Sequence, residues 1–268
     1  MNKKFLIIAF MLSNLAFLRQ VKAVDPSDTF YGQGAGNPTT TGINDSAFGY
    51  YALYSNTDGS FNTATGAYTL FSNTTGGYNT ASGRSALNGN TTGSQNTADG
   101  YHALFNNSTG GYNTANGALA LNNSTTGDYN MASGYQALAF NTIGGSNTAI
   151  GTNALYHNTT GNANTGTGVD ALFSNTTGST NMASGGNALF SNTTGDNNTA
   201  SGFYALYSNT TGTYNMATVM RRSTATPLAP SMRPMVLSCS TATPLETSTR
   251  PLAQAPFTPT PPDRTTLP

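Results

Sequence analysis

The sequence predicts an all-β protein: a parallel β-solenoid of ten 17-residue coils, followed by a disordered C-terminal tail. Three observations predict this fold. The repeat has a constant length, every repeat holds two glycines, and no proline occurs between residues 39 and 218. A fixed period of short segments is typical of stacked coils, in which each coil pairs only with its neighbours.

The repeat is clearest in a leucine that recurs at a constant 17-residue step, without insertion or deletion. We call these residues the Leu row: Leu53, Leu70, Leu87, Leu104, Leu121, Leu138, Leu155, Leu172, Leu189 and Leu206. Ten complete coils then span 45–214, and the array continues to Thr218. Low-complexity disorder is the alternative that composition alone favours, but the constant register argues against it.

The glycines and the residues between them indicate strands rather than helices. One glycine lies four residues before each Leu-row residue, and a second lies six residues after it. Each marks a bend that needs a positive φ or a close backbone approach. The segments between them are too short for helices and hold β-compatible Thr, Tyr and Phe. Without proline, the backbone ladder can run unbroken through the array.

Three apolar positions of each coil are expected to point inward or into an interface. They are the Leu row, the Ala before it (Thr69 replaces it once) and the Ala of the Asn-Thr-Ala segment (Gly166 replaces it once). We expect the recurring Asn side chains to bond to one another along the axis, as in cross-β ladders. Because this core is thin and aromatic residues are abundant, we also expect an oligomer.

The segment Asn147–Gly151 reads Asn-Thr-Ala-Ile-Gly and resembles the Ala-Ile-Gly signature of trimeric autotransporter adhesin heads. The longer coil is similar to NTAxG…AL…NTTG repeats of bacterial and phage fibre proteins. The resemblance covers about 45–214 and implies a left-handed parallel β-roll that assembles as a homotrimer. It also implies an adhesive role at a cell surface.

The N-terminal residues predict export. Lys3 and Lys4 precede an apolar run that is too short for a transmembrane helix, and Val21-Lys22-Ala23 fits a cleavage site. We therefore expect a signal peptide at 1–23, a leader or linker at 24–44, and no membrane span after cleavage. The protein is then secreted or held at the cell surface.

The tail, 219–268, has no Gly, Asn or Tyr and holds ten of the twelve prolines. A disordered linker is one interpretation. The second is a frameshift, because Ser223–Leu228 recurs at Ser240–Leu245, one coil period further along the chain. Codons for an ordinary coil segment, read one base out of phase, give Val219–Leu228. We therefore interpret the tail as out-of-frame repeats and expect no function for Cys239, Arg221 or Arg222.

No catalytic, cofactor-binding or metal-binding residue is predicted. His102 and His157 lie three coils apart in different coil positions, which disfavours joint metal ligation. The Asp residues of the array suggest no carboxylate pair: Asp45, Asp58, Asp99, Asp128, Asp170 and Asp196. The formal net charge of +0 lacks the basic excess of a nucleic-acid binder. The Asn-Thr-Thr segments fit the glycosylation sequon only because of the repeat.

We therefore expect a non-enzymatic structural or adhesive protein that contacts host surfaces or matrix polymers. The alternative is a ligand-binding solenoid, with ice binding as the concrete case. Regular Thr residues such as Thr63, Thr80 and Thr97 favour it, and Met131 and Met182 interrupt the row.

Overall fold

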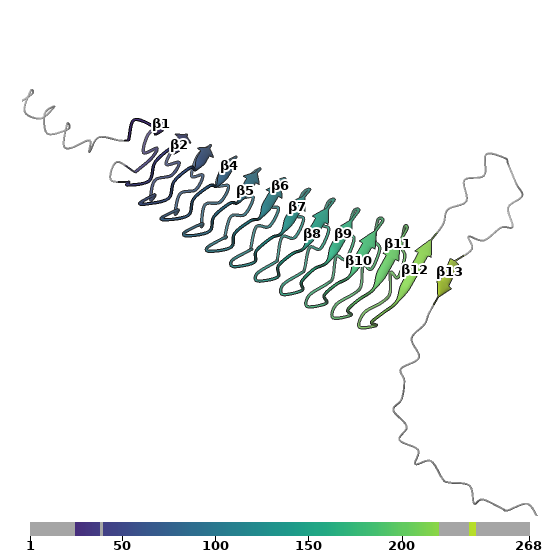
Figure 1. Cartoon of the computed structure of the whole chain (residues 1–268). Helices are drawn as coiled ribbons and strands as arrows, with labels where there is room; N and C mark the ends of the chain where they lie inside the picture. The colour runs from purple at the N-terminus through teal and green to yellow at the C-terminus, as the bar shows by residue number, and fades with distance from the viewer. Residues whose placement is uncertain (1–24, 38–39, 220–235, 240–268) are drawn as a thin grey trace, which may run out of the picture.

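The computed structural model describes residues 25–37, 40–219 and 236–239, and the predicted signal peptide lies outside them. These residues form one sheet of 13 strands whose order in space follows the sequence. Figure 1 shows the strands side by side along one face of an elongated rod, with each coil returning behind them. The described residues contain no helix. The predicted all-β parallel solenoid is confirmed.

The strands are short because each occupies one segment of a coil. Their bounds are β1 Thr29–Tyr31, β2 Ser46–Phe48, β3 Thr63–Thr65, β4 Thr80–Ser82, β5 Thr97–Asp99, β6 Thr114–Asn116, β7 Met131–Ser133, β8 Thr148–Ile150, β9 Thr165–Thr167, β10 Met182–Ser184, β11 Thr199–Ser201, β12 Met216–Val219 and β13 Val236–Cys239. Strands β1 to β12 pair in parallel, and each residue pairs with its equivalent in the next coil, as Thr63 does with Thr80. The sequence period is therefore the period of the fold.

The solenoid begins one coil earlier than the sequence indicated. Residues 28–37 and 40–44, which belong to the predicted leader or linker, form a coil in the same register, with Thr29 opposite Ser46. The recurring Leu does not reveal this coil, because Gly36 occupies the position that Leu holds in the later coils. The Phe30 ring fills that space instead, and a Cβ on Gly36 would overlap it. In this coil the large side chain, Phe30, lies in the strand, and the small residue, Gly36, occupies the Leu-row position. The other coils have the reverse arrangement, with a small strand residue and a large Leu-row residue.

The regular coils end at Val219, which stands where each earlier coil has its bend glycine. Those glycines, Gly32 to Gly202, have φ between 112° and 142°, a conformation that side-chain-bearing residues rarely adopt. At Val219 the strand runs one residue further instead of bending.

The edge of β12 is paired with β13, which runs antiparallel to it. This pairing places a strand within the tail, which the sequence predicted to be disordered. Any extended segment can satisfy the free backbone groups of an edge strand, and the stretch from 235 to 243 contains no proline. The remainder of the predicted tail lies outside the described residues.

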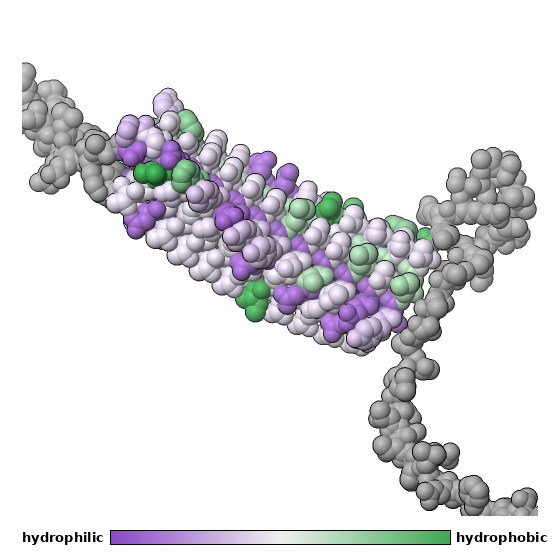
Figure 2. Space-filling model, in the orientation of Figure 1, coloured by the Kyte–Doolittle hydropathy of each residue, from purple (hydrophilic) through white to green (hydrophobic). Residues whose placement is uncertain are grey.

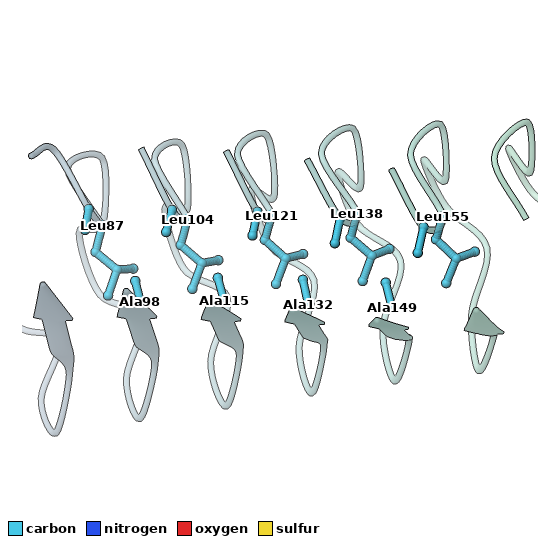
Figure 3. Packing of buried hydrophobic residues seen from close by; sticks show 14 of the residues in the cluster. Leu87, Ala98, Leu104, Ala115, Leu121, Ala132, Leu138, Ala149 and Leu155 are labelled. Atoms are coloured by element: carbon cyan, nitrogen blue, oxygen red, sulfur yellow. The ribbon is translucent and has the colours of Figure 1, made fainter. Parts of the chain in front are cut away.

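The core is a column of Leu and Ala side chains enclosed by a single chain (Figure 3). Leu53 to Leu189 of the Leu row are fully buried, and Leu206 in the last coil is partly buried. Both predicted Ala positions also point inward, as Ala98 and Ala103 show. The expected inward stacking is therefore confirmed, and it needs no second chain to exclude water from these residues.

The Leu row has a left-handed backbone, with φ between 49° and 54° in all ten residues. This conformation costs a non-glycine residue roughly 1 kcal/mol. Burying a Leu side chain contributes about 1.5–3 kcal/mol, which exceeds that cost. The backbone strain at each Leu-row residue is therefore offset, because the same left-handed conformation directs the Leu side chain into the core.

Candidate functional site

Two buried rows of Asn side chains hold the coils in register. The first, the strand Asn row, precedes each strand: Asp28, Asp45, Asn62, Asn79, Asn96, Asn113, Asn130, Asn147, Asn164, Asn181, Asn198 and Asn215. Each Oδ1 accepts a hydrogen bond from the backbone N–H of the next member, at 2.8–3.1 Å. From Asn62 to Asn198, each Nδ2 also donates to the carbonyl of the glycine 14 residues later, at 2.7–3.0 Å.

The second row, the turn Asn row, follows the Leu row: Asn56, Asn73, Asn90, Asn107, Ser124, Asn141, Asn158, Asn175, Asn192 and Asn209. Each Asn that follows another Asn donates from Nδ2 to the Oδ1 of that preceding member, at 2.7–2.8 Å. Each Asn amide also bonds to the glycine carbonyl three residues later in its own turn. The predicted axial Asn ladders are therefore present, and together they link every coil to its neighbour.

The glycine in each Asn-Thr-Thr-Gly turn is required by close approach rather than by its φ. A Cβ on Gly110 would lie 2.5 Å from both the carbonyl oxygen of Gly127 and Oδ1 of Asn107. The first glycine of each coil is required for both predicted reasons, because its φ is positive and a Cβ on it would lie 2.5–2.9 Å from backbone atoms of the next coil.

Two of the Thr rows in the array differ in their chemistry. In the turn Thr row, which runs from Thr57 to Thr193, each hydroxyl donates to a backbone carbonyl of the next coil at 2.8–3.1 Å. The strand Thr row comprises Thr63, Thr80, Thr97, Thr114, Thr148, Thr165 and Thr199. These side chains lie on the outer face of the sheet, and no hydrogen bond joins their hydroxyls to another described residue. The hydroxyls of the strand Thr row are therefore available to an external partner.

Aromatic rings stack on one another along the rod rather than standing alone. The longest stack follows the Leu row through Tyr156, Phe173, Phe190 and Tyr207, with successive centroids 5.1 Å apart. Adjacent planes in it are within 12° of parallel. The ring faces are therefore covered by neighbouring rings, and the stack presents mainly ring edges to the solvent.

Two further aromatic groups lie toward the N-terminal half of the rod. Tyr50, Tyr51, Tyr54, Tyr68 and Phe71 form one cluster, in which Tyr51 and Tyr68 stack at 5.9 Å. The second group contains the stacked pairs Phe61–Tyr78 and Tyr112–Tyr129, both at 4.8 Å. Between the pairs, Gln95 Nε2 donates to the Tyr112 hydroxyl at 3.0 Å. The repeat in the sequence does not single out Tyr50, Tyr51, Phe61 or Tyr68 among these rings.

The two histidines belong to these aromatic groups and lie apart. His102 stacks on Tyr101 at 4.0 Å and on Phe105 at 4.4 Å. Burial, together with the charge of Arg84, lowers the pKa of His102. His157 contacts Phe140, Tyr156 and Phe173. The structure therefore does not bring the two imidazoles together.

The carboxylates of the array have separate, local partners. Asp128 accepts a hydrogen bond from the Gly111 N–H, and Asp196 accepts one from the Ser179 N–H. Asp170 accepts from Asn153 Nδ2, and Asp58 from the Thr41 hydroxyl. Asp99 lies on the exposed face of β5. Asp45 alone is fully buried, within the strand Asn row.

Comparisons with known proteins add no relative. No protein-family model, curated protein or solved structure matches the chain. Among the described residues, no group of three or more His, Cys, Asp or Glu side chains is placed to hold a metal ion. In the same part of the chain, no helix is long and apolar enough to cross a membrane. What the rod offers to a partner is therefore its repeated outer surface.

Figure 2 shows the character of that surface on one face of the rod. Apolar residues appear as scattered spots among weakly polar ones rather than as one broad area. The exposed apolar side chains include Tyr78, Tyr129, Ile143, Val169 and Met182. A partner would meet the same uncharged, weakly polar chemistry many times along the axis.

Proposed function

We propose that the protein is an exported structural or adhesive rod that makes many weak contacts with surfaces or host and matrix polymers. The observation that supports this function is the repetition itself: hydroxyl and aromatic rows recur at a constant 17-residue step from β2 to β12. Contacts that repeat along a rigid rod engage the same target surface at the same time, so modest individual affinities combine into strong retention.

Deleting coils in whole units tests this proposal. Removal of one, two or four complete coils in register keeps the remaining ladders intact while shortening the binding surface. Retention on collagen-, cellulose- or chitin-coated surfaces should then fall steeply with each deletion. Equal retention by the shortest and the full array would contradict a multivalent rod, and no retention on any coating would remove the adhesive function.

Trimerisation is part of the same proposal. Exposed rings such as Tyr78 and Tyr129, at 62% and 61% exposure, offer apolar area for lateral contact between rods. Analytical ultracentrifugation of residues 24–218 tests it. A trimer at micromolar concentration is expected, and a folded monomer at that concentration would contradict the proposal.

Export and the frameshift are tested on the protein and its gene. Cleavage after Ala23 would leave Val24 as the first residue, which N-terminal sequencing of the secreted chain detects. The gene read one base out of phase beyond codon 219 should encode Asn-Thr-Thr-Gly at a 17-codon spacing. An early stop codon in that frame would refute the frameshift.

Ice binding is the second candidate, and the strand Thr row is the observation that favours it. Its free hydroxyls lie on a regular sheet, but Met131, Met182 and Met216 protrude from the same positions. Replacing Met131 and Met182 with Thr lengthens the row without touching the core. Thermal hysteresis that increases in this variant would support ice binding, and its absence in both proteins would exclude it.

A further inference from the structure

The strand Asn row changes its chemistry at the N-terminal end of the rod. Ten of its members are Asn, and the two that open it are Asp28 and Asp45. Asp45 is fully buried between the first coil, which comprises the described residues 28–37 and 40–44, and the coils that follow. An isolated carboxylate loses favourable hydration when it is buried, so its charged form is costly there.

The contacts of Asp45 tie it to both sides of this junction. Its Oδ1 accepts the Asn62 N–H and its Oδ2 accepts Asn56 Nδ2, both at 2.8 Å. Its own N–H donates to Asp28 Oδ1, also at 2.8 Å. The second oxygen of Asp28, Oδ2, is buried and has no hydrogen-bond partner. Two carboxyl groups therefore meet at the junction, and one of them has an unsatisfied oxygen.

No positive charge compensates this pair within the described part of the first coils. Residues 25–37 and 40–83 contain four Asp and no Lys, Arg or His, and Arg84 is the first basic residue of the described part of the chain. Asp25 is hydrogen-bonded to Ser27, and Asp58 accepts from Thr41 on the turn. Burial, assisted by the charge of Asp28, raises the pKa of Asp45 to about 6, against the opposing effect of its hydrogen bonds from Asn62 and Asn56.

The first coil packs against one neighbouring coil, because β1 is the first strand of the described sheet. Strands β1 and β2 pair over three residues, and the Phe30 ring is the large apolar side chain that the coil contributes to the core. A turn precedes β1, and in it the Asp28 N–H donates to the Asp25 carbonyl at 2.8 Å. Detachment would open the Asp45 carboxylate to water and separate it from Asp28.

We propose that the first coil is a pH-gated cap, docked on the rod while Asp45 is protonated and released in a growing fraction as Asp45 ionises. Release uncovers the edge of β2, whose backbone groups can then pair with another strand. The docked state binds more protons than the released state, in which Asp45 has its ordinary acidity. Docking is therefore strongest below pH 4, weakens as the pH rises toward 6, and changes little above that.

Hydrogen–deuterium exchange of the full exported chain between pH 4 and 7.5 tests the proposal. After correction for intrinsic exchange rates, the opening equilibrium of amides in 29–44 should rise by a factor on the order of 10 to 100 across this range. Amides of β5 and β6 in the same molecule should show no such rise and serve as the internal reference.

Two substitutions make the test specific. Asp45→Asn places the usual residue of the row at this position, so the pH dependence should disappear while the cap stays docked. Asp99→Asn, an exposed change on β5, should leave the dependence as in the natural chain. Asp28→Asn, a further variant, removes only the neighbouring charge and should weaken the dependence. A flat opening equilibrium in the natural chain, or an unchanged dependence in Asp45→Asn, would overturn the proposal.

Discussion

Ser124 breaks the turn Asn row and leaves the amide oxygen of Asn107 without a hydrogen-bond partner. In the regular coils, the Asn of the next coil donates to that oxygen, as Asn107 does to Asn90 at 2.7 Å. The Ser124 side chain is too short, and its buried hydroxyl is also unpaired. One coil junction in the middle of the rod therefore lacks the link that its neighbours have.

Ser124→Asn should stabilise the rod by about 1–2 kcal/mol, because it satisfies a buried acceptor and extends the ladder to Asn141. Urea unfolding followed by circular dichroism measures the change. Ser201→Asn, on the exposed face of β11, is the matched control and should change stability by less than about 0.5 kcal/mol. Equal effects of the two substitutions would show that the ladder adds no stability.

Adjacent glycines provide a second matched pair. A Cβ on Gly144 would overlap the Gly161 carbonyl oxygen and lie 2.5 Å from Asn141 Oδ1, whereas a Cβ on Gly145 would meet no atom closer than 3.2 Å. Gly144→Ala should therefore cost roughly 2–4 kcal/mol or more, and Gly145→Ala less than about 1 kcal/mol. Thermal unfolding of both variants checks this, and a milder effect at Gly144 would contradict the coil geometry.

Gly166 occupies an inward strand position that holds Ala in the neighbouring coils. Its added Cβ would lie 3.2 Å from the carbonyl oxygen of Ala171 and 3.3 Å from Cγ of Leu155, contacts that shifts of a few tenths of an ångström relieve. Gly166→Ala should stabilise the chain by about 0.5–1 kcal/mol, through lower unfolded-state entropy and better packing. A lower unfolding midpoint in denaturant would instead show that Leu155 cannot move.

Glycosylation would disrupt the turn Asn row. Asn73 and Asn90 lie in Asn-Thr-Thr sequons, yet both are fully buried and donate their amides within the ladder. A chain expressed through a glycosylating secretory pathway should therefore carry glycans and fail to fold. The same expression with glycosylation blocked is the control. Mass spectrometry and circular dichroism report both properties, and a glycosylated chain with native strand content would contradict the buried ladder.

The sequence predicted the repeated features of the fold because every coil repeats the same physical requirements. The Leu row, both Ala positions, the glycine bends and the Asn ladders follow from one 17-residue pattern. The departures from the pattern were harder to predict. The first coil was missed because Phe30 and Gly36 exchange the usual large and small positions. Strand β13 was missed because its pairing with β12 depends on a free edge and not on the repeat.

The candidate surface was only partly predictable, for a related reason. Period alone does not distinguish a Thr hydroxyl that donates to the next coil, such as Thr74, from one that faces solvent, such as Thr80. Nor does it show that Tyr156 and Phe173 stack face to face, which depends on the 5.1 Å step between their rings. The buried state of Asp45 likewise emerges only when the row is assembled.

The central claim is that two buried Asn ladders hold the coils in register. Exchange of the Asn side-chain amide protons with solvent, measured by NMR, tests this claim most directly. The amides of both rows, from Asn62 to Asn198, are predicted to exchange as slowly as the strand backbone, because they are buried and hydrogen-bonded. The exposed Asn116 should exchange rapidly in the same sample. Rapid exchange of the row amides in a folded chain would contradict the ladders and the solenoid built on them.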